Sequence, residues 1–167
     1  MNLDILKTFS WFTGLVLAQV FVLNHIHLFG MATPLLYVYF VLLFRRNYPQ
    51  WVMMLWAFLM GLVIDTFSNT PGVASGSLTL MAAVQPFVLR SFIPRDSTDD
   101  LQPGIGTLGF GSYFSYAAIM TSLFSLVFFS LEMFSFFNLV EWVECVVGSS
   151  LITLVLLLVI DYVRGQR

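Results

Sequence analysis

The sequence has few charged residues, one cysteine and two histidines. Asp, Glu, Lys and Arg make up 10% of its 167 residues, whereas a soluble domain carries about 25%. A chain this poor in charge cannot cover a surface exposed to water. Its net charge is −2 and its longest basic stretch is Arg45-Arg46, so it lacks the basic patch of a nucleic-acid-binding protein. The single Cys145 excludes an internal disulfide, and we expect this residue to pack within an apolar run.

Apolar residues are correspondingly abundant, at 59% of the chain. A helix needs about 20 apolar residues to cross the hydrocarbon layer of a bilayer, and about 17 is a working minimum. Six segments approach or exceed that length: 8–28, 30–44, 49–65, 77–92, 112–131 and 138–163. We therefore predict an all-α, polytopic membrane protein, in which residues 1–167 form one domain with six transmembrane helices in membrane lipid.

The basic residues indicate the orientation, because cytoplasmic loops collect Lys and Arg. With six spans and a cytoplasmic N-terminus, all seven basic residues lie in inside segments or reach them from a helix end: Lys7, Arg45, Arg46, Arg90, Arg95, Arg164 and Arg167. The outer loops contain none. This asymmetry predicts that the N- and C-termini are both cytoplasmic.

Asp65 is the most informative acidic residue, because a charge in a span is costly and faces the protein interior, water or a partner. Gly61 stands four residues before it, and Pro71 and Gly72 mark a turn after it. Three roles remain open for the carboxylate: it caps the turn by accepting backbone N–H groups, it contacts a partner or ligand, or it acts as a catalytic acid.

Small residues at helical spacing predict close helix packing in lipid. Gly14 and Ala18 form such a pair in the first segment, and Cys145, Gly148 or Ser149, and Ile152 or Thr153 form a similar stripe in the last. These positions pack inside the bundle or dock a partner's helix. Two further polar residues, Gln19 and Gln85 (the latter beside Pro86), are expected to bond across helices, to compensate for the backbone hydrogen bond that Pro86 removes, or to line a pocket.

Other motifs give little reason to expect catalysis or a cofactor. Gly104, Gly106 and Gly109 spell G-I-G-T-L-G, but a polar loop precedes them and no βαβ unit fits around them, so we interpret the loop 94–111 as a flexible connector. His25 and His27 are two residues apart, without a Cys cluster or a helical His-Glu motif, which is weak support for a metal site. We therefore expect no enzyme activity, no cofactor and no metal.

The pattern Gly61-x-x-x-Asp65, followed by Pro71, Gly72 and an apolar span, resembles the signature of the MreD family of rod shape-determining membrane proteins. Here Pro71 and Gly72 are adjacent, whereas the family usually separates them by an apolar residue. Chain length, span number and the short basic tail are also similar, so the resemblance covers essentially the whole chain.

The resemblance implies a non-enzymatic subunit in a bacterial inner membrane. It would organise lateral peptidoglycan synthesis with the scaffold MreC, and indirectly with MreB and the peptidoglycan synthases. It also implies a fold similar to the six-helix substrate-binding subunits of energy-coupling-factor transporters. That similarity supplies the alternative, a vitamin-binding uptake subunit with a polar pocket to which Asp65, His25, His27 and Glu141 could contribute.

Overall fold

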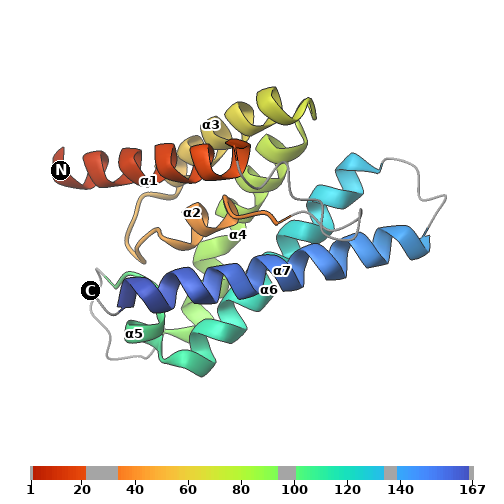
Figure 1. The fold of residues 1–167 in the computed structure, drawn as a ribbon. Helices are drawn as coiled ribbons and strands as arrows, with labels where there is room; N and C mark the ends of the chain where they lie inside the picture. The colour runs from red at the N-terminus through yellow and green to blue at the C-terminus, as the bar shows by residue number, and fades with distance from the viewer. Residues whose placement is uncertain (1, 22–33, 94–100, 134–138, 166–167) are drawn as a thin grey trace.

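The computed structural model describes residues 2–21, 34–93, 101–133 and 139–165. These residues form helices, joined by turns and short loops, and contain no strand. The helices are α1 Asn2–Phe21, α2 Val38–Leu42, α3 Gln50–Ser68, α4 Val73–Phe92, α5 Ile105–Leu108, α6 Phe110–Glu132 and α7 Leu139–Gly165 (Figure 1).

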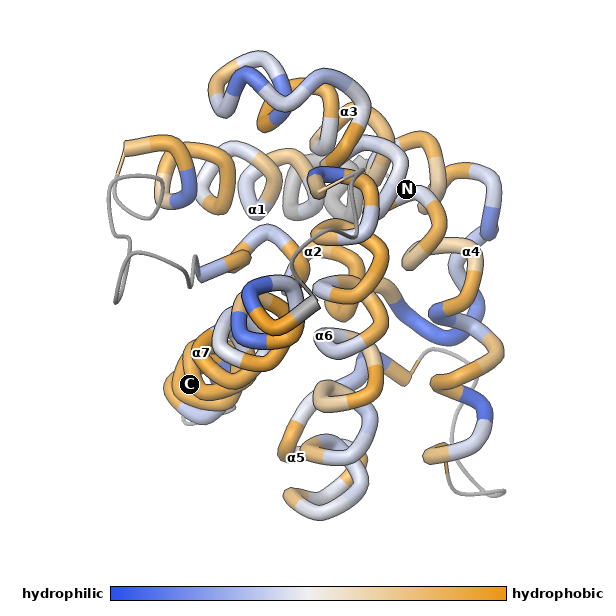
Figure 2. The backbone as a smooth tube through the Cα atoms, turned by 90° about the vertical axis from the view of Figure 1, so that its right-hand side faces the viewer, coloured by the Kyte–Doolittle hydropathy of each residue, from blue (hydrophilic) through white to orange (hydrophobic). Residues whose placement is uncertain are grey.

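Within the described ranges, four helices are long and apolar enough to cross a membrane: α3, α4, α6 and the stretch Val140–Arg164 of α7. They coincide with four of the predicted segments, 49–65, 77–92, 112–131 and 138–163, which confirms the prediction of an α-helical membrane protein. The apolar part of α1 is shorter, at Thr8–Phe21. In Figure 2 the hydrophobic colour extends along much of these long helices.

The two faces of α7 show the inverted pattern of a helix in lipid. Its buried face carries small or polar residues and one leucine at intervals of four, and its exposed face carries branched apolar residues at the same interval. The buried set is Cys145, Ser149, Thr153, Leu157 and Asp161, and the exposed set is Val143, Val147, Leu151, Val155 and Val159. A soluble helix would place these faces the other way round. The predicted stripe left Gly148 or Ser149 and Ile152 or Thr153 open, and the structure buries Ser149 and Thr153 with Cys145, so the stripe packs within the chain.

The second predicted span, 30–44, differs from the structure. Within the described part of this span, residues 34–44, a helix extends only over α2, which is five residues long and follows two irregular and two turn residues at 34–37. All of residues 34–44, here called the central segment, are buried. Among the described elements α2 contacts α1, α3, α4 and α6. The prediction of one spanning helix over 30–44 is thus wrong, because protein rather than lipid surrounds this apolar run.

Side chains from three surrounding helices satisfy the irregular backbone of the central segment. Gln19 on α1 donates to the carbonyl of Pro34 and accepts from the N–H of Leu36, both at 3.0 Å. The N–H of Leu35 donates to the Thr153 hydroxyl on α7, and Gln85 on α4 donates to the Phe44 carbonyl. Irregular backbone at membrane depth is tolerated only with such partners. Gln19 and Gln85 therefore bond across elements, as one of the sequence interpretations predicted.

The start of α1 and the end of α7 lie at the same end of the molecule (Figure 1). The chain also returns to this end before α3 begins, and α5 lies there as well. The turn between α3 and α4 lies at the opposite end. We call the end with the start of α1 and the end of α7 the terminal end, and the other the hairpin end.

Candidate functional site

At the hairpin end, the turn between α3 and α4 is built around Asp65. Helix α3 stops at Asn69, which adopts the left-handed conformation with φ 56°, and Gly72 before α4 has φ +84°. Asn and Gly are the residues that tolerate these angles. The turn therefore reverses the chain within four residues and brings the first N–H groups of α4 back over the last turn of α3.

The Asp65 carboxylate accepts four hydrogen bonds from this turn. Oδ1 accepts from the N–H of Ala74 at 2.8 Å and from the Thr70 hydroxyl at 3.2 Å, and Oδ2 accepts from the N–H of Ser75 at 3.0 Å and of Gly72 at 3.1 Å. The side chain is 5% exposed. The first N–H groups of a helix lack partners within it, and Gly72 at the cap position has no side chain to supply one. Asp65 fills that role from the preceding helix.

Gly61, one helical turn before Asp65 on α3, allows the two helices of this hairpin to pack closely. A Cβ placed there would lie 2.8 Å from the carbonyl carbon of Ala74 and closer still to the backbone of Ser75. No side chain fits between the two helices at this point, so the absence of a Cβ sets how closely α3 and α4 approach. The close approach in turn places the N–H groups of α4 within reach of Asp65.

The four predicted motif residues, Gly61, Asp65, Pro71 and Gly72, thus come together in one hairpin. Asp65 faces inward with both oxygens engaged, an arrangement that fits turn capping. A catalytic role would need access to substrate that this geometry does not provide. Pro71 and Gly72 are exposed on the outside of the turn, where they are accessible to a partner.

The predicted packing pair of α1 divides between two environments. Ala18 is partly buried and packs against the core. Gly14 is exposed, and no atom of the described residues lies within 4 Å of a Cβ built there. Gly14 therefore does not mediate packing within the described part of the chain, and the other sequence interpretation, docking of a partner's helix, stays open for it.

A second buried carboxylate, Asp161 on α7, was missed from the sequence. Its Oδ1 accepts from the Tyr39 hydroxyl at 3.1 Å, and its Oδ2 accepts from the N–H of Ile105 at 2.6 Å. Arg164, one turn later, lies 3.9 Å from Oδ1 and donates to the Tyr39 hydroxyl at 3.4 Å. The four-residue stripe from Cys145 to Asp161 is the signal that would have placed this residue on the buried face.

Asp161 also corrects the interpretation of the glycine-rich loop. Gly104 is the cap residue of α5, and the carboxylate of Asp161 lies 3.4 Å from the position of its absent Cβ. The carboxylate holds the first N–H of this short helix, while the N–H of Arg46 donates to the carbonyl of Leu101. Residues 101–109 are thus anchored to α7 and to the loop before α3, and are not a free connector.

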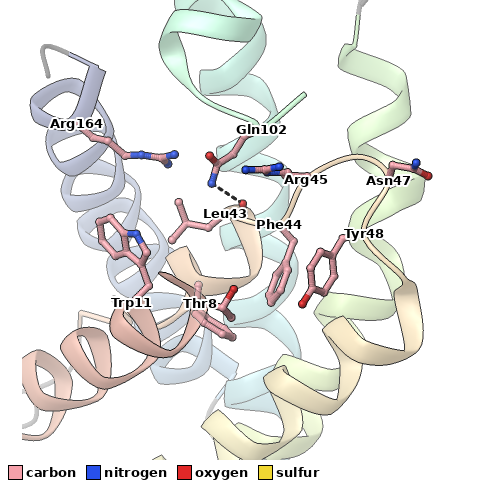
Figure 3. A pocket seen from close by; sticks show the side chains of 10 residues that line it. Thr8, Trp11, Leu43, Phe44, Arg45, Asn47, Tyr48, Gln102 and Arg164 are labelled. Atoms are coloured by element: carbon pink, nitrogen blue, oxygen red, sulfur yellow. Dashed lines mark hydrogen bonds between the residues drawn. The ribbon is translucent and has the colours of Figure 1, made fainter. Parts of the chain in front are cut away.

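Beside this cluster, at the terminal end, lies a cavity of about 320 Å³. Figure 3 shows Arg164 and Arg45 reaching toward Gln102 from opposite sides. The cavity is lined by Thr8, Trp11, Phe40, Leu43, Phe44, Arg45, Asn47, Tyr48, Gln102 and Arg164. It therefore has a cationic and polar rim above aromatic and aliphatic side chains.

The remaining candidates for a metal site are His25, His27 and Glu141. His25 and His27 lie outside the described residues. Glu141 is exposed near the start of α7. The part of the chain that the structure describes contains no group of three or more His, Cys, Asp or Glu side chains placed to hold a metal ion.

No protein-family model matches the chain, and neither any curated protein nor any solved structure matches it.

Proposed function

We propose that this chain is a non-enzymatic membrane subunit of the bacterial cell-elongation machinery, of the MreD type. The observation that carries the proposal is the α3–α4 hairpin. The residues that resemble the family signature, Gly61, Asp65, Pro71 and Gly72, form one structural unit. Gly61 admits the neighbouring backbone, Asp65 caps α4, and Gly72 supplies the positive φ angle. Because Gly61, Asp65 and Gly72 each meet a separate physical requirement, the joint pattern is more specific than its letters suggest.

The large share of the described residues that lies in apolar helices supports a role through partner proteins. Most described residues belong to long apolar helices whose outward faces are hydrophobic, so little of the described chain is placed to act in water. An MreC-like scaffold is the expected direct partner, and through it MreB and the peptidoglycan synthases. Gly14 on α1 is the position we assign to the docking of the single transmembrane helix of such a scaffold.

In this proposal the chain crosses a bacterial inner membrane six times, with both termini in the cytoplasm and a fold similar to energy-coupling-factor binding subunits. The central segment lies on the second crossing and is covered by other helices. Arg45, Arg46 and Arg164 all belong to the terminal end, where α1 starts and α7 ends, which favours a cytoplasmic location for it.

Cysteine labelling of intact cells tests this orientation. In a Cys145→Ser background, we expect a membrane-impermeant maleimide to label Pro71→Cys in the exposed hairpin turn. Asn47→Cys, which is exposed at the opposite end, should be labelled only after the cells are opened. Labelling of Asn47→Cys in intact cells would contradict the proposed orientation.

The test of function is complementation together with co-purification. In a rod-shaped bacterium depleted of its own MreD, expression of this chain should restore cell width. The tagged chain should retain co-expressed MreC in detergent, whereas an unrelated protein with one transmembrane helix is the control that should not be retained. Rounded cells and no enrichment of MreC over this control would refute the proposal.

The alternative, a vitamin-binding uptake subunit, needs a polar pocket to which His25, His27, Glu141 and the Asp65 carboxylate could contribute. The four hydrogen bonds that this carboxylate accepts within the hairpin leave it poorly placed to hold a ligand. We therefore favour the cell-shape role. Mass spectrometry of the purified protein separates the two, because a vitamin retained in a stoichiometric amount would favour uptake.

A further inference from the structure

Residues 101–109, here called the strap, lie at the terminal end of the molecule, where α5 contacts α6 and α7 (Figure 1). Hydrogen bonds tie the strap to three other parts of the chain. The carbonyl of Leu101 accepts from the loop before α3, Gln102 donates to the end of the central segment, and the N–H of Ile105 donates to Asp161 on α7. The strap is therefore held mainly by polar contacts.

Few apolar side chains of the strap are buried. Pro103 and Leu108 are buried, whereas the other strap residues are exposed or partly exposed. Helix α5 has four residues, and a helix of this length has almost no stability of its own. The strap also contains Gly104, Gly106 and Gly109, which gain more backbone freedom on opening than other residues do. Local opening costs least in such segments, so the strap can open while the long helices stay packed.

The contact with Asp161 is placed to act as a latch. The first N–H groups of a helix lack partners within it, and the Asp161 carboxylate supplies one from α7 at 2.6 Å from the Ile105 nitrogen. Asp161 is 4% exposed, and the position of the absent Gly104 Cβ lies 3.4 Å from its carboxylate. The strap thus covers Asp161 directly. At the hairpin end Asp65 uses the same chemistry, but there it joins two long, closely packed helices.

Gly109 is placed to act as a hinge. It is the single residue between α5, which ends at Leu108, and α6, which begins at Phe110. Its φ of 80° and ψ of 154° form a combination that is essentially restricted to glycine. Rotation about this residue moves α5 without moving α6.

A buried polar group lies next to the latch. Tyr113 is 1% exposed on α6, one turn after the hinge, and its hydroxyl has no hydrogen-bond partner among the described residues. This hydroxyl is close enough to Asp161 and Tyr39 to interact with both electrostatically. The closed strap therefore adjoins a carboxylate and two phenols, all of them buried.

We propose that the strap is a gate that turns about Gly109 and closes onto Asp161, and that its opening exposes Asp161 and Tyr113 at the terminal end. The closed state is the one in the structure, held by the bond from Ile105 to Asp161. Opening breaks this bond and leaves the bundle of long helices folded. The gate does not depend on the proposed role in cell shape.

Exchange of single backbone amide hydrogens, followed by NMR on the full-length protein in detergent micelles, tests the gate. The informative amides are those of Leu108 and Gly109, because their acceptors, the carbonyls of Gly104 and Ile105, lie within the strap. In the wild-type protein these two amides should exchange faster than amides in the middle of α6. Exchange as slow as in α6 would overturn the proposal.

Asp161→Ala removes the latch. It should speed exchange at Leu108 and Gly109 by about ten- to hundredfold, the effect of losing a hydrogen bond to a charged acceptor, and leave exchange in the middle of α6 unchanged. Tyr39→Phe is the matched control, because it removes the other hydrogen bond to this carboxylate and leaves that of Ile105. Its effect on the strap should stay within about twofold.

Three results with these variants would overturn the latch. The first is faster exchange at Ile105 alone, which would mean loss of one bond without opening. The second is an equal rise in the strap and in α6, which would mean opening of the whole bundle. The third is an equal effect of Asp161→Ala and Tyr39→Phe on the strap.

Two glycine substitutions test the hinge without touching the latch. A Cβ at Gly109 or at Gly106 meets no atom within 4 Å, and Gly109 alone of the two has a positive φ. Gly109→Ala should therefore strain the closed strap and speed exchange at Leu108 by about tenfold. Gly106→Ala should slow it by about two- to fivefold, because Ala favours the helix. Slower or unchanged exchange in Gly109→Ala would overturn the hinge.

Discussion

Replacement of Asp65 by Asn is the sharpest test of the hairpin. The substitution keeps the size of the side chain and removes its charge. The amide of Asn keeps one oxygen as an acceptor. Its NH2 group takes the place of the other carboxylate oxygen and cannot accept the hydrogen bonds that this oxygen accepts in the wild-type protein. With Oδ1 retained toward Ala74, the N–H groups of Gly72 and Ser75 lose their acceptor. If the amide oxygen instead takes the position of Oδ2, the N–H of Ala74 and the Thr70 hydroxyl lose their acceptor.

The expected loss follows from these donors. A partly or fully buried donor without a partner costs about 1–3 kcal/mol, and bonds to a charged acceptor are the stronger kind. Ser75 is buried and Gly72 is exposed on the turn. Water can therefore replace the lost acceptor of the Gly72 N–H, which lowers the cost of that loss, but not that of the Ser75 N–H. We expect Asp65→Asn to lower the free energy of unfolding by about 2–4 kcal/mol.

The measurement is reversible unfolding of the purified protein in mixed micelles of a mild detergent and dodecyl sulfate. Glu144→Gln is the matched control, because it also removes one acidic charge but from an exposed position on α7. Its effect should stay within about 0.5 kcal/mol. An Asp65→Asn protein as stable as this control would refute the capping role. Normal stability combined with loss of MreC binding would reassign Asp65 to a partner contact.

Three further substitutions test the packing. Gly61→Ala should destabilise the protein by about 3 kcal/mol, because the new methyl group overlaps the backbone of α4. Gly76→Ala is the control and should be neutral or stabilising in the same unfolding assay, because the nearest atom lies 3.7 Å from the new methyl group. Equal effects of the two substitutions would contradict the close approach of α3 and α4. Gly14→Leu should leave the free energy of unfolding unchanged and reduce the recovery of MreC in co-purification. Gly111→Leu on α6, where an added Cβ also meets no atom within 4 Å, is the control and should reduce neither stability nor MreC recovery. Normal MreC recovery with Gly14→Leu would exclude this face of α1 as the docking face. Gln19→Leu should cost about 1–3 kcal/mol, since it leaves two backbone groups of the central segment unpaired, and a stability equal to wild type would show that water replaces the amide.

The α3–α4 hairpin was predicted from the sequence only in part. The spacing of Gly61, Asp65, Pro71 and Gly72 predicted a turn and gave three roles for the carboxylate. Sequence spacing cannot choose among them, because the choice depends on which donors lie within about 3 Å of the oxygens. Those donors belong to the first turn of the next helix, and only the close approach at Gly61 brings them near.

The central segment and Asp161 show where sequence reasoning failed. An apolar run of about 15 residues has the same composition whether lipid or protein surrounds it, so 30–44 was taken for a spanning helix. Asp161 lies close to the basic C-terminal end, and no role was predicted for it from the sequence. Its partners Tyr39 and Ile105 are 122 and 56 residues away in sequence, a separation that no local pattern encodes.

By itself the sequence determined that this is an α-helical membrane protein, because the shortage of charge and the length of the apolar runs depend on composition alone. It also indicated a stripe of small residues on α7, since helical periodicity is local, but left open whether this stripe packs within the chain or against a partner. Tertiary structure decided which polar groups are paired, which apolar run is shielded by other helices, and where two arginines distant in sequence meet over one cavity. These features depend on how helices pack against one another, and in an apolar chain many packings satisfy the same hydrophobic pattern while few satisfy every buried hydrogen-bonding group.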